Sequence, residues 1–222
     1  MIDKGSLKDS LNIKELELVL AEKPSFFAAF SRGGQPGNQK MLQQPLTITV
    51  RPSTEADVAA MIAIYSYHVQ YGLGDYPSEP PAQDDLKRRR KSMLKRNLPH
   101  LVADHVGQVV GYAFAVPFRK RPAYRYAVKH SIYVHQDHLH AGIGRQLLPV
   151  LIEACANAGY RQMISYIDGE NIPSLHLHEL FGFERVGLLP SIGFKFGHWT
   201  DTVLMQRALG LGNQDLPGDL GF

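Results

Sequence analysis

A short strand pattern that runs into a turn with two glycines, followed by a helix pattern, constrains this chain most. Residues 131–134 read Ser-Ile-Tyr-Val, residues 142–145 read Gly-Ile-Gly-Arg, and helix-forming residues continue to Ala158. Glycine lets the backbone approach a ligand closely, and the unpaired N–H groups at a helix start favour an anion such as a phosphate. The pattern therefore predicts an anion-binding turn between a strand and a helix.

Two well-known phosphate motifs do not fit this turn. A Walker A loop needs Gly-Lys-Ser/Thr, and a dinucleotide fingerprint needs a third glycine where Arg145-Gln146-Leu147 stands. A lone G-x-G is a weak signal, because a helix start that binds nothing can carry the same glycines. Both interpretations stay open on the residues of the turn alone.

Composition limits the class of protein. The 222 residues are 44% hydrophobic and 20% charged, which is typical of one globular domain with appendages. With 24 basic and 21 acidic residues the net charge is +3, too little to mark a dedicated nucleic-acid binder. The single cysteine, Cys155, excludes an intramolecular disulfide framework and a cysteine-based zinc site, and it favours a reducing compartment.

Nothing in the sequence predicts a membrane segment. No apolar run approaches the roughly 20 residues that span a bilayer, and the N-terminus lacks the apolar stretch of a signal peptide. We expect a cytoplasmic protein whose partners include neither membrane nor nucleic acid.

The chain divides into three parts. Residues 11–20 have the spacing of a short amphipathic helix, and residues 31–40 have the Gly/Pro composition of a linker, so we assign residues 1–44 to an N-terminal extension. Residues 45–209 form the main domain. The glycine-rich residues 210–222 are expected to be a flexible tail.

Within the main domain the patterns alternate in a mixed order. We expect strands at 46–51, 101–103, 109–116, 129–134, 163–167 and 199–206, a loop over 69–83, and helices from 54, at 84–96, at 143–158 and at 174–180. Because a hairpin precedes the single late strand-helix-strand unit, the order predicts an α+β, mixed α/β sheet rather than a doubly wound Rossmann sheet.

Several motifs in this order resemble a known family. The turn at 142–145, Asn171-Ile172-Pro173-Ser174 and Gly182-Phe183 are similar to the GNAT superfamily of acetyl-coenzyme A-dependent N-acetyltransferases. Residues 48–52, 117–126, 131–134 and 193–201 resemble its phosphinothricin and methionine sulfoximine acetyltransferase branch. The resemblance covers about 46–209. It implies a mixed, mostly antiparallel sheet with flanking helices and two parallel strands that splay apart, and it implies homodimers.

The resemblance also implies a coenzyme site that needs no metal. Acetyl-coenzyme A would lie where the parallel strands splay, and the acceptor amine would attack the thioester directly. The implied contacts are the backbone of Ile132, Tyr133 and Val134 for the pantetheine, the backbone of His140, Ala141, Gly142, Ile143, Gly144 and Arg145 for the pyrophosphate, and Asn171.

His178 is the candidate for proton transfer. It stands where most of the superfamily has the tyrosine that protonates the leaving thiolate, and where the phosphinothricin branch has histidine. An imidazole titrating near neutral pH can accept or donate a proton. The alternative is a helix histidine packed against the sheet.

Two residues depart from the branch. Lys129 stands where the branch usually has a glutamate that acts on the amine, and a lysine would repel an ammonium acceptor. We retain Lys129 as a candidate catalytic position, and strand alternation places its neighbour His130 on the opposite face. Leu139 stands where the pyrophosphate loop commonly begins with Gln or Arg.

Arg121 and Tyr124 match the branch's contacts to the acidic end of an amino-acid-like substrate. Arginine suits a carboxylate or phosphinate because its planar fork donates two parallel hydrogen bonds. The alternative is a solvated basic loop.

Two other clusters are not interpreted as sites. His135, His138 and His140 lack a carboxylate cluster, so we expect no metal there. The basic run 87–91 is interpreted as the solvated face of a helix.

The sequence thus predicts an N-acetyltransferase that acetylates the amine of a small amino-acid-like molecule of the phosphinothricin or methionine sulfoximine type. The alternative acceptors are a polyamine, an aminoglycoside or a peptide N-terminus. A non-catalytic coenzyme-binding or interaction module is the alternative from another class.

Overall fold

The computed structural model describes residues 47–72 and 79–218 of the chain. The predicted extension over residues 1–44, with its helix, lies outside the described residues. The boundaries assigned to the extension, the main domain and the tail therefore remain predictions.

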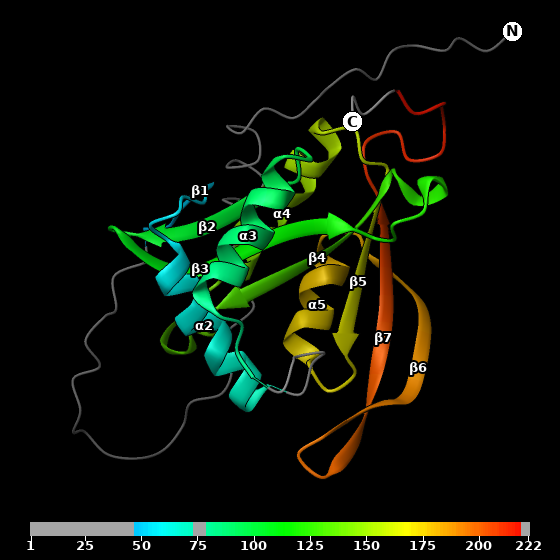
Figure 1. The fold of residues 1–222 in the computed structure, drawn as a ribbon. Helices are drawn as coiled ribbons and strands as arrows, with labels where there is room; N and C mark the ends of the chain where they lie inside the picture. Colours follow the sequence, from blue (N-terminus) through cyan, green and yellow to red (C-terminus); the bar gives the residue numbers. More distant parts are fainter. Residues whose placement is uncertain (1–46, 73–78, 219–222) are drawn as a thin grey trace, which may run out of the picture. The chain divides into compact units, whose positions relative to one another are not determined.

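Seven strands form one sheet in the order β1-β2-β3-β4-β5-β7-β6 (Figure 1). Neighbouring strands are antiparallel except β4 and β5, which are parallel. This confirms the predicted mixed, mostly antiparallel sheet. The strands are β1 (Thr49–Pro52), β2 (His100–His105), β3 (Gln108–Pro117), β4 (Ala127–Val134), β5 (Gln162–Asp168), β6 (Glu184–Lys195) and β7 (His198–Ala208).

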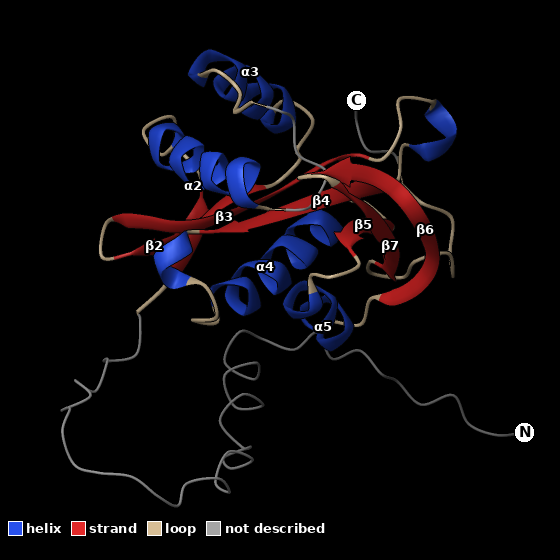
Figure 2. Ribbon diagram, turned by 90° about the horizontal axis from the view of Figure 1, so that it is seen from below, coloured by secondary structure: helices blue, strands red, loops and turns tan. Residues whose placement is uncertain are grey.

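Helices cover both faces of the sheet (Figure 2). On one face lie α2 (Val58–Tyr71) and α3 (Gln83–Leu94), and on the other lie α4 (Ile143–Asn157) and α5 (Ile172–Leu180). Two single turns of 3-10 helix, η1 (Pro122–Tyr124) and η2 (Gln136–His138), flank β4. Each face has its own apolar core, because strand side chains alternate between the faces.

The larger core lies against α4. Leu147, Leu148 and Leu151 are fully buried there, and so is Cys155. Burial raises the pKa of the Cys155 thiol to about 12, so the thiol stays protonated and unreactive at neutral pH. The smaller core, around Val58, Met61 and Val102, lies under α2 and α3.

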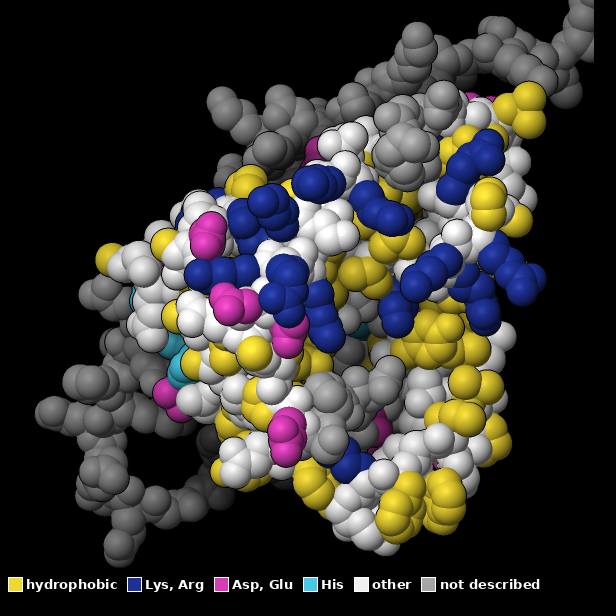
Figure 3. Space-filling model, in the orientation of Figure 1, with side chains coloured by type: hydrophobic (Ala, Val, Ile, Leu, Met, Phe, Trp, Pro, Cys, Tyr) yellow, Lys and Arg dark blue, Asp and Glu magenta, His cyan; other side chains and the backbone are white. Residues whose placement is uncertain are grey.

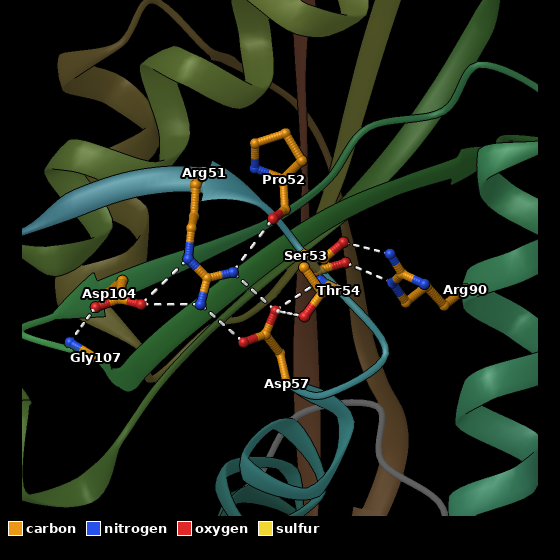
Figure 4. Close-up of polar contacts among 8 residues, drawn as sticks. All are labelled: Arg51, Pro52, Ser53, Thr54, Asp57, Arg90, Asp104 and Gly107. Carbon is orange, nitrogen blue, oxygen red and sulfur yellow. Dashed lines mark hydrogen bonds and ion pairs between the residues drawn. The ribbon is translucent and has the colours of Figure 1, made fainter.

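An ionic network fixes the N-terminal edge of the sheet (Figure 4). Arg51 on β1 donates to both carboxylate oxygens of Asp57 at 2.8 Å, and to Asp104 on β2 at 2.8 and 3.1 Å. Asp57 also accepts from the backbone N–H of Thr54 at 2.6 Å, which explains why the chain turns into α2 here. The Arg51 guanidinium holds the pKa of Asp57 well below its usual range.

One strand was missed by the sequence analysis. β6 pairs with β7, but its register shifts between Leu189 and Gly193, around Pro190 and Ser191. Proline cannot donate to a ladder, and glycine weakens a strand, so these residues hid a strand that an edge position tolerates. The other expected elements are present, with ends that differ by a few residues.

Among residues 47–72 and 79–218, no helix combines the length and the apolar character needed to cross a membrane.

Candidate active site

The parallel strands β4 and β5 separate after a short contact. They pair only at Ala127–Gln162, Val128–Met163 and Lys129–Ile164. Beyond Lys129, β4 continues to pair with β3 as far as Val134, while β5 pairs with β7 as far as Asp168. The splayed strand pair is therefore present, and it opens at Lys129 and Ile164.

A buried imidazole lies where the strands separate. His178 on α5 is 3% exposed, and its Nε2 lies 2.9 Å from Nε2 of His130 and 3.2 Å from Oγ of Ser165. His130 and Ser165 are the first residues after the last paired positions of their strands. His178 therefore contacts both strands at the beginning of the splay.

Hydrogen bonds assign the tautomers of this group. Nδ1 of His178 lies 2.7 Å from the carbonyl oxygen of Ser174, which can only accept, so Nδ1 carries the proton. In the neutral ring, Nε2 of His178 is then an acceptor. Its lone pair is shared between the His130 Nε2–H and the Ser165 hydroxyl. Burial lowers the pKa of His178, and burial together with the nearby His178 lowers the pKa of His130 to about 3. Both rings are neutral at pH 7.

The two-glycine turn forms the start of α4. Gly142 is the N-cap residue with φ of +81°, a conformation that glycine adopts without strain. Within the described chain no acceptor bonds the backbone N–H groups of Gly142, Ile143 and Gly144. Three donors therefore remain available at the positive end of a 15-residue helix.

Packing between α4 and α5 also favours glycine at position 144. A Cβ at this position would lie 2.9 Å from Cδ2 of Leu177 on α5. The residue therefore permits close contact between α4 and α5, whereas a Cβ on Gly142 would meet nothing within 4 Å. The other implied pyrophosphate residues, His140, Ala141 and Arg145, are exposed around the same turn.

The implied pantetheine residues lie on the part of β4 beyond the splay. Ile132 packs on the α4 core, while the Tyr133 ring lies on the opposite face, 5.0 Å from Tyr112. The Val134 carbonyl already accepts a hydrogen bond from His68 Nε2 on α2, at 2.8 Å. Asn171 caps α5, accepting from the N–H of Ser174 at 3.1 Å.

The candidate substrate residues lie on the other face. Arg121 and Tyr124 lie at η1 and line a hollow of about 400 Å³ together with Arg119 and Lys120. Lys129 points away from His130, as strand alternation predicts, into a separate cavity of about 640 Å³ on the α2/α3 face. Arg119 and Lys120 line both spaces, so the two adjoin.

The sequence does not predict this larger cavity. Arg89 and Arg96, from the basic segment around α3, line it together with residues of β3 and β4. The basic run 87–91 could have indicated a cationic cavity, but its residues have different environments. Lys87 pairs with Glu55, Arg88 with Asp85, and Arg90 donates to Ser53, whereas Arg89 faces the cavity.

The histidine cluster beyond β4 is loosely arranged. The rings of His135 and His138 are 5.6 Å apart, and His105 approaches His138 at 6.4 Å. The described residues contain no group of three or more His, Cys, Asp or Glu side chains that could hold a metal ion.

Comparison with known proteins places these features in context. The model of the acetyltransferase (GNAT) domain matches residues 50–204. The chain is 42% identical over 170 residues to phosphinothricin N-acetyltransferase of Alcaligenes faecalis, covering 76% of this chain and 86% of that protein. It is 33% identical over 162 residues to the L-methionine sulfoximine/L-methionine sulfone acetyltransferase of Salmonella typhimurium, covering 73% and 95%.

A solved structure agrees with these relatives. The phosphinothricin acetyltransferase of Sinorhizobium meliloti, in complex with AcCoA, superposes with a TM-score of 0.76 at 39% identity. The match covers 78% of this chain and 95% of that one. These comparisons support the enzyme over the non-catalytic module, and they confirm the predicted fold.

Proposed function

The chain belongs to the GNAT acetyltransferase family, and from that membership we propose that it acetylates the amine of a small amino-acid-like molecule of the phosphinothricin or methionine sulfoximine type. It is an N-acetyltransferase that uses acetyl-coenzyme A. The observation that carries the proposal is the splay of β4 and β5 at Lys129 and Ile164, beside the helix start with available N–H donors.

The coenzyme fits these residues. The backbone donors of Gly142, Ile143 and Gly144 suit a pyrophosphate, as do the neighbouring His140, Ala141 and Arg145. Ile132, Tyr133 and Val134 form the β4 segment that no longer pairs with β5, where a pantetheine chain would lie along the strand. We assign to Asn171 an additional contact through its side-chain nitrogen, because its oxygen caps α5.

When bound, the coenzyme supplies an acetyl thioester. His178 is proposed to carry one proton. Nε2 would take it from the acceptor ammonium, the freed amine would form the C–N bond as the C–S bond breaks, and His178 would return the proton to the thiolate sulfur. The nitrogen of the new amide would lose its second proton to solvent. The lowered pKa of His178 makes the imidazolium a ready acid but the neutral ring a weak base. The thiolate step is therefore the one that His178 favours.

The acidic end of the acceptor is assigned to Arg121 and Tyr124. Both are exposed at the β3–β4 connection, beside Arg119, whose guanidinium lies 5.2 Å from the centre of the Phe118 ring. Lys129, also exposed on this side of the sheet, adds a further positive charge where the strands begin to separate. Two exposed arginine forks and a lysine suit an anionic group.

We also propose that the chain is a cytoplasmic homodimer that binds neither nucleic acid nor membrane. The single cysteine is buried and unpaired, which suits a reducing compartment. The edge hairpin formed by β6 and β7, from Glu184 to Ala208, exposes large hydrophobic side chains that a second copy would cover.

Release of free thiol from acetyl-coenzyme A tests the proposed acceptor class. We expect amine-dependent release with phosphinothricin or methionine sulfoximine to exceed release with spermidine, an aminoglycoside or a peptide N-terminus by at least tenfold in kcat/KM. Acetyl-coenzyme A without an acceptor is the control for hydrolysis. Equal or faster turnover of one of the other amines would replace the acceptor class.

A further inference from the structure

The cavity on the α2/α3 face has an aromatic floor. Tyr112 lies 5.0 Å from Tyr133 and 6.1 Å from Phe114, ring centre to ring centre, in stacked arrangements. The ring of His100 is stacked 5.4 Å from Phe114. Tyr112 and His100 are buried, and the half-buried rings of Phe114 and Tyr133 line a cavity of about 640 Å³, within the range that binds drug-sized molecules.

The lining of this cavity carries cations and no acidic side chain. The cations are Arg89 on α3, Arg96 just after it, Arg119 and Lys120 after β3, and Lys129 on β4. Within the described residues none of the five forms an ion pair. By contrast, the neighbouring Lys87 and Arg88 on α3 are both paired with carboxylates.

The positive charges lie on two sides of the cavity. Figure 3 shows Lys and Arg side chains gathered over α3 and, across a strip of hydrophobic side chains, around the β3–β4 connection. All five cations are exposed to solvent. A ligand with a negative group toward each side can form charge-assisted hydrogen bonds with cations at both places, whereas a single anionic group can do so at one.

Lys129 connects this cavity to the reaction. It is the last β4 residue that pairs with β5, so an occupant that reaches Lys129 also reaches the point where the strands separate. Its charge would repel a simple ammonium acceptor. Two negative groups on the acceptor offset that repulsion. They allow its ammonium group to approach Lys129, whereas a neutral or cationic molecule does not offset the repulsion.

We propose that the cavity is the acceptor site and that it selects an amine with an apolar body and two anionic groups. One group lies toward Arg89 and Arg96, and the other lies toward Arg119, Lys120 and Lys129, beside the adjoining hollow of Arg121 and Tyr124. The inference rests on the proposed acetyltransferase reaction and narrows its substrate class. An amino acid with a single anionic group leaves the α3 side of the cavity unpaired.

Calorimetry with two matched probes tests the inference independently of turnover. The full chain, saturated with coenzyme A, is titrated with para-carboxyphenylalanine and with para-methylphenylalanine, which differ in the second anionic group. We expect the carboxylate probe to bind at least tenfold more tightly, because charge-assisted hydrogen bonds form on both sides (about tenfold for each 1.4 kcal/mol). Equal affinities, or tighter binding of the methyl probe, would overturn the proposal.

A substitution pair locates the second anionic group. Arg96→Gln should weaken the carboxylate probe about tenfold or more and leave the methyl probe within about twofold. Arg88→Gln is the matched control, because Arg88 lies on the same helix but pairs with Asp85 outside the cavity. Melting curves confirm that both variants fold. If Arg96→Gln affects neither probe, the α3 side is not part of the site and the proposal fails.

The two proposals fail differently. Absence of acetyl transfer to every amine, with selective binding of the carboxylate probe, would reject the proposed reaction and leave the anion selectivity standing. Acetyl transfer without a preference between the probes would leave the reaction and reject the inferred class.

Discussion

The side chain of His178 contacts both splayed strands and is also the proposed proton carrier. Its Nε2 contacts His130 on β4 and Ser165 on β5, and its Nδ1 is held by the carbonyl of its own helix. The two interpretations of the sequence, a packed histidine and a proton carrier, are therefore compatible. The same hydrogen bonds that hold the ring between the strands leave it in one neutral tautomer.

Replacing His178 separates these roles. We expect His178→Ala to lower kcat by about a hundredfold or more, since a positioned acid–base group contributes roughly 10²–10⁴. The KM for acetyl-coenzyme A should stay within about twofold, because the proposed coenzyme contacts are backbone groups of β4 and α4. Steady-state thiol release measures both constants.

His176→Ala is the matched control for this prediction. His176 is exposed on the same helix, so its substitution should leave kcat unchanged. His178→Gln keeps a polar side chain between the strands should the alanine variant fail to fold. Unchanged kcat in either folded His178 variant contradicts proton transfer by this residue.

At the scale of elements, the Arg51 network connects β1 to the start of α2, and the apolar side chains of these two elements belong to different cores. One guanidinium links β1, the start of α2 and β2, while Arg90 of α3 donates to Ser53 beside it. β1 has only four residues, so its own ladder fixes it weakly. The charged hydrogen bonds therefore determine where α2 begins relative to the sheet.

Removing the Asp57 charge should destabilise the fold. We expect Asp57→Asn to lower the free energy of unfolding at pH 7 by about 1.5–3 kcal/mol, the usual contribution of hydrogen bonds to charged groups. Because the Asp57 pKa is depressed below its unfolded value of about 3.9, this contribution is present above that value and is lost as pH falls from about 5 through the folded pKa. The variant should therefore lose less stability than the parent chain over that interval.

Urea unfolding at a series of pH values measures the effect. Asp85→Asn, which breaks the exposed pair with Arg88, is the control and should change stability by less than about 1 kcal/mol. Parallel pH profiles for Asp57→Asn and the parent chain would show that this carboxylate is not the acid-sensitive group.

Local patterns predicted most elements, and tertiary contacts account for what they missed. β2 and β3 alternate over a short turn, and α4 has regular apolar spacing, so both were predictable. β6 was not, because Pro190 and Gly193 interrupt its pattern. The splay came only from the family resemblance, and the strand order was not predicted, since no local pattern states which distant strands pair.

The same distinction explains the candidate site. The turn at Gly142 is local, and the sequence predicted it. The cavity joins Arg89 and Arg96 to Lys129, residues far apart in the chain that only the sheet brings together. Charge in one helix does not reveal which side chains find partners, so the basic run was interpreted as an undivided solvated face.

At the scale of the whole molecule, the β6–β7 hairpin exposes apolar side chains that a second copy of the chain could cover. Ile192, Phe194 and Phe196 on or beside β6 and Trp199 on β7 are each more than half exposed. β6 is also the edge of the sheet. Exposed apolar side chains on an unpaired edge strand are costly in water and favour association.

A charge placed on this hairpin should separate the proposed dimer. We expect the parent chain to sediment as a dimer, and Phe194→Asp with Trp199→Asp to sediment as a monomer with its strands intact by circular dichroism. Leu180→Asp, an exposed apolar position on α5, is the control and should remain dimeric. A monomeric parent chain, or a dimeric double variant, contradicts association through the hairpin.

The brief pairing of β4 with β5 has a mechanical consequence. Three residue pairs join the two halves of the sheet, β1 to β4 and β5 to β6, fewer than at any other junction between the described strands. Backbone pairing within the sheet is therefore weakest along this line, where the larger apolar core and the ring of His178 also connect the two halves. A molecule bound along the line would add hydrogen bonds where the sheet has fewest.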